Sequence, residues 1–152
     1  MNRTTLETFK IVGLSVRTTN ENGQAATDIP ALWSRFFAEE ISSKITHKLS
    51  DDMYCMYTDY EKDHTKPYTT ILGYKVDSGA SVPEGLTAKT VEAHTYDVIP
   101  AKGKMSEGFV FQAWQKIWNS DMNRTYTADF EVYGSKAWDP ENAEIEIYIA
   151  VK

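Results

Sequence analysis

Isoleucine alternates with polar side chains in the segment Ala143-Glu144-Ile145-Glu146-Ile147-Tyr148-Ile149-Ala150-Val151-Lys152. Successive side chains of a β-strand point to opposite faces of a sheet, so this alternation predicts a strand with one apolar and one polar face. The polar face would hold Glu144, Glu146 and Tyr148, an unusual content for a strand so rich in β-branched residues. We therefore select Glu146 as the first candidate for a functional residue.

The first half of the chain has the pattern strand, helix, strand, strand. Residues 8–18 have strand character, and Asp28 can cap an amphipathic helix that follows a polar loop. Residues 53–61 and 68–76 then form a predicted hairpin. Gly73 inside the second of these strands indicates a bulge or a close approach by another group.

The second half repeats this order after a linker-like segment at residues 77–85. Residues 86–99 have strand character with a break, and Ser106 can cap a second amphipathic helix. Residues 125–133 and 144–151 supply the second strand pair. Two βαββ units in tandem are the simplest account of this repeat.

The two units are too small to bury their helices separately. We predict an α+β fold in which pseudo-repeats at about residues 1–78 and 86–152 join into one antiparallel sheet, with both helices on one face. The 152 residues would then form a single domain. A cleft between the two helices, at the junction of the repeats, is the expected place for a small-molecule site.

Composition narrows the class of ligand. The net charge is −6 and the sequence contains no cluster of Lys and Arg, which disfavours direct nucleic-acid binding and favours cations. Four Trp, nine Tyr and six Phe are more rings than a core of this size requires, so some are expected to line a pocket. The single Cys55 and the absence of an apolar run of about 18 residues favour a cytoplasmic protein without a membrane segment.

Six short motifs, in order and over nearly the whole chain, give the sequence a family resemblance. It resembles the integron-associated effector-binding proteins, a branch of the GyrI-like superfamily that also includes the ligand-binding domains of AraC-type and multidrug-responsive transcription regulators. The motifs are Asp28-Ile29-Pro30-Ala31-Leu32-Trp33, Tyr57-Thr58-Asp59-Tyr60-Glu61, Ile71-Leu72-Gly73-Tyr74-Lys75-Val76, Ala113-Trp114-Gln115-Lys116-Ile117-Trp118, Asp129-Phe130-Glu131-Val132-Tyr133 and Glu146-Ile147-Tyr148-Ile149-Ala150-Val151-Lys152.

The resemblance implies an eight-stranded antiparallel sheet with two helices, and an aromatic cleft that holds lipophilic, often cationic, molecules over an acidic residue. Glu146 occupies the matching acidic position, with Glu131 and Glu144 as alternatives if the strand register differs by one residue. The family pattern often has Pro where this chain has Ala150. The candidate ligand-binding residues are Glu146, Tyr60, Tyr74, Phe111, Trp114 and Tyr148, followed by Trp33 and Glu131.

A stand-alone effector-binding domain for lipophilic cations, without a cofactor, is therefore the leading hypothesis. Trp33 and Trp114, at helical spacing, are also what a simple core helix would contain. The three histidines lack metal-site spacing, but a carboxylate in an apolar pocket could act as a general base in a small hydrolase of reactive electrophiles. A protein-interaction module like the gyrase-inhibiting relatives is a third possibility. Without a helix-turn-helix in the two units, a transcriptional output would need a separate regulatory protein chain.

Overall fold

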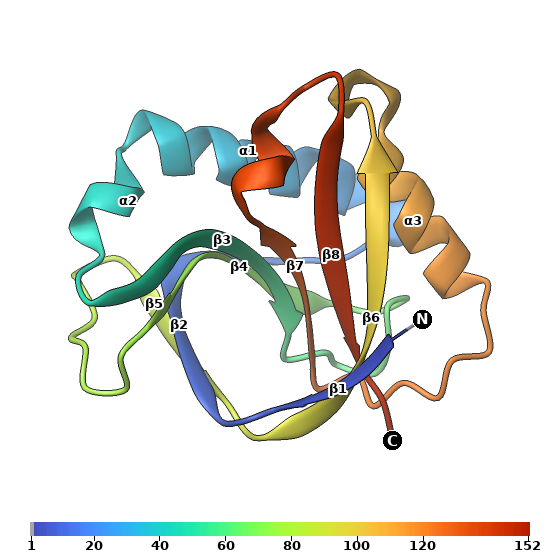
Figure 1. The fold of residues 1–152 in the computed structure, drawn as a ribbon, viewed down its shortest axis with the longest axis horizontal. Coiled ribbons are helices and arrows are strands. Elements are labelled where there is room, and N and C mark those ends of the chain that lie inside the picture. The colour runs from blue at the N-terminus through green and yellow to red at the C-terminus, as the bar shows by residue number, and fades with distance from the viewer. Residues whose placement is uncertain (1) are drawn as a thin grey trace.

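Eight antiparallel strands form one strongly curled sheet in the computed structural model, which describes residues 2–152 (Figure 1). The spatial order of the strands is β1-β6-β8-β7-β3-β4-β2-β5. The α+β class is confirmed, while Met1, the first residue of the predicted domain and repeat, lies outside the described residues. The strands are β1 (Asn2–Leu6), β2 (Phe9–Thr18), β3 (Lys48–Thr58), β4 (Tyr68–Val76), β5 (Thr87–Val91), β6 (His94–Gly103), β7 (Ala128–Tyr133) and β8 (Ala143–Ala150).

The predicted duplication is visible in the order of the strands. On one side of the sheet's centre β3, β4 and β2 are neighbours, and on the other side β7, β8 and β6 repeat that arrangement. The two halves meet where β3 pairs with β7, from Met53 opposite Tyr133 to Thr58 opposite Ala128. The edge strands are exchanged, because β1 pairs with β6 of the second half and β5 pairs with β2 of the first. The break predicted within residues 86–99 separates β5 from β6, whereas β1 was not predicted.

The helices are α1 (Gln24–Ala38), the short α2 (Ile41–Lys44) and α3 (Phe109–Trp118). Asp28 does not cap the first helix, because α1 already begins at Gln24, after Gly23 in a left-handed conformation (φ 71°). The Asp28 carboxylate instead accepts hydrogen bonds from Thr18 Oγ1 (2.8 Å) and Gln24 Nε2 (3.0 Å).

The start predicted for the second helix is also displaced. Ser106 lies in a 3₁₀ turn, Met105–Glu107, and Gly108 (φ 65°) is the residue that precedes α3. At both helix starts a glycine provides the left-handed turn that few other residues adopt readily. The capping residues therefore predicted that the two helices exist but not the residues at which they begin. None of the helices in the described part of the chain has the length and apolar character needed to cross a bilayer.

The two faces of the sheet bury separate apolar clusters. The first cluster joins α1 and α3 to one face and includes Ile145, Ile147 and Ile149 of β8. The second cluster lies on the opposite face, where Phe130 is buried and Tyr148 packs beside it. The alternation in β8 is confirmed, and its isoleucine face is the one that the helices cover.

Gly73 marks the close approach that its position predicted. It lies opposite Gly13 in the β2–β4 pair, and a Cβ atom at residue 73 would lie 2.0 Å from the carbonyl oxygen of Val12. Gly73→Ala should therefore lower the free energy of unfolding by about 3 kcal/mol, because backbone rather than a flexible side chain must move. Urea unfolding measures this loss. Gly79→Ala, whose Cβ would meet only Asp77 Oδ2 at 3.3 Å, is the control and should change stability by less than about 0.5 kcal/mol; equal effects of the two variants would contradict the prediction.

Candidate ligand-binding site

A cavity of about 470 Å³ lies between α1, α3 and the strands at the centre of the sheet. Its walls are mainly aromatic and aliphatic, and three of the four tryptophans contribute to them. The volume is within the range of small-molecule pockets in proteins. The lining residues include Ile29, Pro30 and Trp33 of α1, Val110, Phe111, Trp114 and Trp118 of α3, Tyr57, Tyr68, Glu131 and Tyr133 of the sheet, and Tyr60, His64 and Arg124 of the loops.

Glu131, on β7, is the carboxylate of this cavity. Its residue is only 2% exposed, and three side chains donate hydrogen bonds to it. Tyr57 Oη (2.8 Å) and Trp114 Nε1 (2.6 Å) donate to Oε2, and Tyr133 Oη (2.6 Å) donates to Oε1. Because these donors come from β3, α3 and β7, the hydrogen bonds fix the carboxylate at the base of the cavity.

The charge of Glu131 has no basic partner among residues 2–152, since none of their ion pairs involves it. Burial raises the pKa of Glu131 above its ordinary value, and the hydrogen bonds from Tyr133, Tyr57 and Trp114 oppose that rise. Burial also raises the pKa of Tyr57 and of Tyr133, so both phenols remain protonated donors. The cavity thus contains a buried acidic group whose negative form lacks a counterion.

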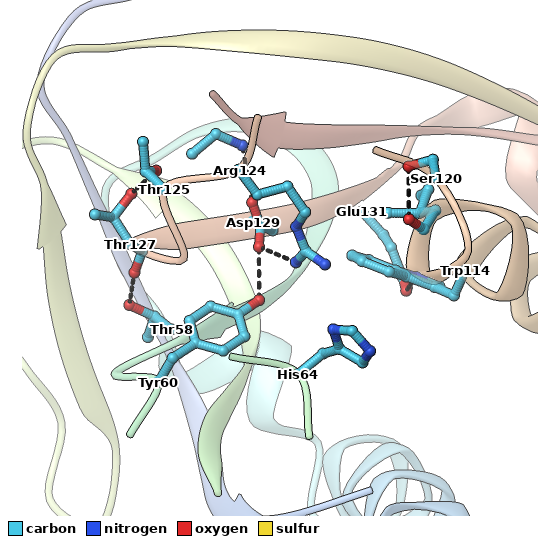
Figure 2. Close-up of polar contacts among 12 residues, drawn as sticks. Thr58, Tyr60, His64, Trp114, Ser120, Arg124, Thr125, Thr127, Asp129 and Glu131 are labelled. Carbon is cyan, nitrogen blue, oxygen red and sulfur yellow. Dashed lines mark hydrogen bonds and ion pairs between the residues drawn. The ribbon is translucent and has the colours of Figure 1, made fainter. Parts of the chain in front are cut away.

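A separate polar network lies at the other end of the cavity (Figure 2). The Asp129 carboxylate is fully buried and forms an ion pair with Arg124 Nη2 at 2.7 Å. It also accepts hydrogen bonds from Tyr60 Oη (2.6 Å) and from the backbone N–H of Ala150 (2.8 Å). Asp129 is therefore neutralised within the protein, in contrast to Glu131.

The loop between β3 and β4 forms one wall of the cavity through His64. The His64 ring stacks on Trp118, with centroids 5.5 Å apart and planes 7° from parallel. Asn20 Nδ2 donates to the His64 carbonyl oxygen at 2.8 Å, and Tyr68 Oη donates to Asn20 Oδ1 at 2.7 Å. These contacts join the β3–β4 loop to Trp118 at the end of α3 and to Asn20, which lies before α1. No group of three or more His, Cys, Asp or Glu side chains within residues 2–152 is placed to hold a metal ion.

Residues 4–151 match the model of the Cass2 family, described as integron-associated effector binding protein. The chain belongs to this family. A solved Cass2 relative, the integron cassette protein VCH_CASS2 from the mobile metagenome of Vibrio cholerae, is 31% identical, with a TM-score of 0.73 over 99% of this chain and 95% of the relative.

One sequence relative and one protein of similar fold are also similar to this chain. The Bacillus subtilis (strain 168) protein YobU, which has a provisional name as a transcriptional regulator, is 29% identical over 98% of this chain and 96% of its own length. The structure of SAV2435 bound to tetraphenylphosphonium has a TM-score of 0.77 at 18% identity, covering 99% of this chain and 93% of SAV2435. The family and fold identify the chain as an effector-binding domain.

The structure of this Cass2-family chain brings together five of the eight residues predicted for the site. Trp33, Tyr60, Phe111, Trp114 and Glu131 line the cavity. Tyr60 does so because Asp59 has a left-handed conformation (φ 50°), which interrupts the alternation after β3. As a result Tyr57 and Tyr60, which strict alternation would place on opposite faces, line the same cavity.

The other three predicted residues lie elsewhere. Glu146 is exposed on the face of the sheet opposite the helices, because Ile145 and Ile147 on either side of it face the helices. Tyr148 is on that same opposite face, stacked on Phe130 with centroids 4.8 Å apart. Tyr74 is on the helix side but packs beneath Phe36, away from the cavity lining. The placement of Glu146 in the cleft is therefore corrected. Glu144, the other alternative, forms an ion pair with Lys102 at 3.7 Å.

Several lining residues were not among the predicted ones. Tyr57 and Tyr133 could have been found from Glu131, because Tyr133 is two residues along the same strand and Tyr57 is two residues from Cys55, which lies opposite Glu131. Trp118 is one helical turn beyond Trp114. Arg124 and His64 lie in loops, where no periodic pattern indicates which way a side chain points.

Proposed function

We propose that the chain binds lipophilic organic cations in the cavity between α1 and α3, with Glu131 as the residue that selects positive charge. The observation that supports this most strongly is the Glu131 carboxylate, buried among aromatic rings without a counterion from residues 2–152. Removing a carboxylate from water is unfavourable unless an opposite charge accompanies it. A cationic ligand would provide that charge from within the cavity.

The aromatic walls support the same class of ligand. The faces of Trp, Tyr and Phe rings attract cations, each contributing on the order of 0.5–2 kcal/mol depending on how well water is excluded. Apolar contact with the rings requires less exact geometry than hydrogen bonding does. We therefore expect broad selectivity among cations of suitable size. The tetraphenylphosphonium bound by SAV2435, a protein of the same fold, is a lipophilic cation of this kind.

The test uses tetraphenylphosphonium and tetraphenylborate, which have nearly the same shape and opposite charges. Tetraphenylphosphonium should quench the intrinsic fluorescence, because Trp33, Trp114 and Trp118 line the cavity. Calorimetry should show that it binds at least about tenfold more tightly than tetraphenylborate, a difference of about 1.4 kcal/mol. Equal affinities would contradict selection by charge.

Two controls accompany this titration. Trp138 is half-exposed and outside the cavity lining, so Trp138→Phe should leave the quenching intact. Incubation with an activated ester examines the hydrolase alternative on the same sample. Turnover that Glu131→Gln abolishes would favour the hydrolase, whereas binding without turnover favours the effector-binding role.

A further inference from the structure

Arg124 is a buried guanidinium that uses only part of its hydrogen-bonding capacity. The residue is 7% exposed, and its Nη2 atom pairs with Asp129 Oδ2 at 2.7 Å. Among the described residues, its Nε and Nη1 atoms have no hydrogen-bond partner although both are closed to solvent. Unpaired buried donors are unfavourable, and guanidinium N–H groups form strong hydrogen bonds to carbonyl and carboxylate oxygens.

The unpaired donors belong to the same cavity as Glu131. Arg124 lines it, and the Arg124 Cζ atom lies 6.0 Å from the centre of the Trp114 ring and 4.3 Å from that of Tyr126. The Trp114 indole also donates to Glu131, so one ring contacts both charged groups of the cavity. In Figure 2 the guanidinium lies between Asp129 on one side and the rings of His64 and Trp114 on the other.

A second unpaired nitrogen lies at this end of the cavity. His64 Nδ1 is buried and has no hydrogen-bond partner among residues 2–152. Burial, together with the nearby positive charge of Arg124, lowers the pKa of His64, so the imidazole is neutral at physiological pH. A neutral imidazole protonated at Nδ1 could donate to the same oxygen that Arg124 would bind.

We propose that Arg124 forms an acceptor subsite, which binds a carbonyl or carboxylate oxygen of a ligand whose cationic group is held near Glu131. This inference rests on the proposed function and specifies its substrate class further. The preferred ligands are lipophilic cations that also contain a hydrogen-bond acceptor, rather than pure hydrocarbon cations. An oxygen in this subsite would satisfy Nε or Nη1 while Asp129 keeps its bond to Nη2.

The experiment compares two probes, pentyltriphenylphosphonium and (4-carboxybutyl)triphenylphosphonium, which differ by a terminal carboxylate. The ratio of their dissociation constants is measured by calorimetry for the wild type and for Arg124→Lys. Lysine can still pair with Asp129 but has no second arm, so the preference for the carboxylate probe should fall by about tenfold or more. Arg3→Lys is the matched control, since Arg3 pairs with Asp97 (2.9 Å) outside the cavity lining, and the ratio should not change.

A ratio that is the same in the wild type and in Arg124→Lys would overturn the acceptor subsite. If Arg124→Lys does not fold, a crystal structure of the wild type with the carboxylate probe decides instead. The expected result is a carboxylate oxygen within about 3.2 Å of Arg124 Nε or Nη1, and a carboxylate in solvent would reject the proposal. Failure of both probes to bind the wild type would instead reject the proposed function, so the two failures are distinguishable.

Discussion

Glu131→Gln should weaken tetraphenylphosphonium binding by about 10- to 100-fold, equivalent to about 1.4–2.7 kcal/mol. The carboxylate is buried in the cavity and no cation of the described chain neutralises it, so its attraction for a ligand cation is poorly screened. Glutamine removes the charge and keeps the size of the side chain. Calorimetric titration of the variant and the wild type at pH 7 measures the difference.

The variant should retain its fold, because the three donors around residue 131 can adapt to an amide. Tyr57 Oη and Trp114 Nε1 both donate to Oε2, a position that the amide oxygen can occupy. Tyr133 Oη donates to Oε1, and its hydroxyl can rotate to accept a hydrogen bond from the amide nitrogen instead. Lost affinity would therefore report lost charge rather than a collapsed cavity.

The same variant tests the pH dependence of binding. The pKa of Glu131 is raised by burial, so as pH falls through that raised value the folded protein takes up a proton and loses the negative charge. A phosphonium keeps its charge at every pH. Its affinity for the wild type should therefore fall as the pH falls, whereas its affinity for Glu131→Gln should not change with pH. For stability the sign is opposite, because a folded-state carboxyl pKa above the unfolded one makes stability decrease as pH rises between the two values.

Glu146→Gln is the matched control for both measurements. Glu146 lies on the neighbouring strand of the same sheet but is exposed on the face opposite the helices. Its loss should leave the affinity and its pH dependence unchanged within about twofold. An equal loss from the two variants would show that the net charge of the protein, rather than a charge in the cavity, attracts the cation.

The contrast between these two glutamates shows what periodicity can predict. Alternation in β8 correctly separates Glu146 from the isoleucines, but it does not state which face the helices will cover. Apolar side chains cover both faces of this sheet, since Phe130 and Tyr148 form part of a second cluster opposite the helices. The polar residues of β8 therefore lie beside a second core instead of in the cleft.

The register in which the two repeats are aligned decides which of their side chains are matched. If the sequences of the two halves are aligned so that Tyr57 matches Phe130, Thr58 is aligned with Glu131. In the structure Tyr57 is on the helix side while Phe130 is on the other face, so that match is wrong by an odd number of residues. An odd shift moves every side chain of a strand to the other face, which is why the fold was predictable while Glu131 was predicted only as an alternative to Glu146.

The Arg124–Asp129 ion pair could not be predicted from the sequence, because no periodic pattern relates a loop residue to a strand residue five positions away. Asp129→Ala should lower the free energy of unfolding by about 3–5 kcal/mol, since it leaves the Arg124 charge buried and unpaired. The variant also removes the acceptor for Tyr60 Oη and for the N–H of Ala150. Urea unfolding followed by tryptophan fluorescence measures the loss.

The control is an ion pair of the same chemistry at the edge of the sheet. Arg3 pairs with Asp97 at 2.9 Å, but the Arg3 side chain is 62% exposed, so Asp97→Ala should lower the free energy of unfolding by only about 0–1 kcal/mol. Asp129→Asn keeps the shape of the carboxylate, so its loss of unfolding free energy should lie between those of Asp97→Ala and Asp129→Ala. Solvent stabilises the charge of Arg3 but not that of Arg124. Similar losses of stability from Asp97→Ala and Asp129→Ala would therefore mean that water or a counterion reaches Arg124. The Arg124 guanidinium would then have no unsatisfied N–H group for a ligand oxygen.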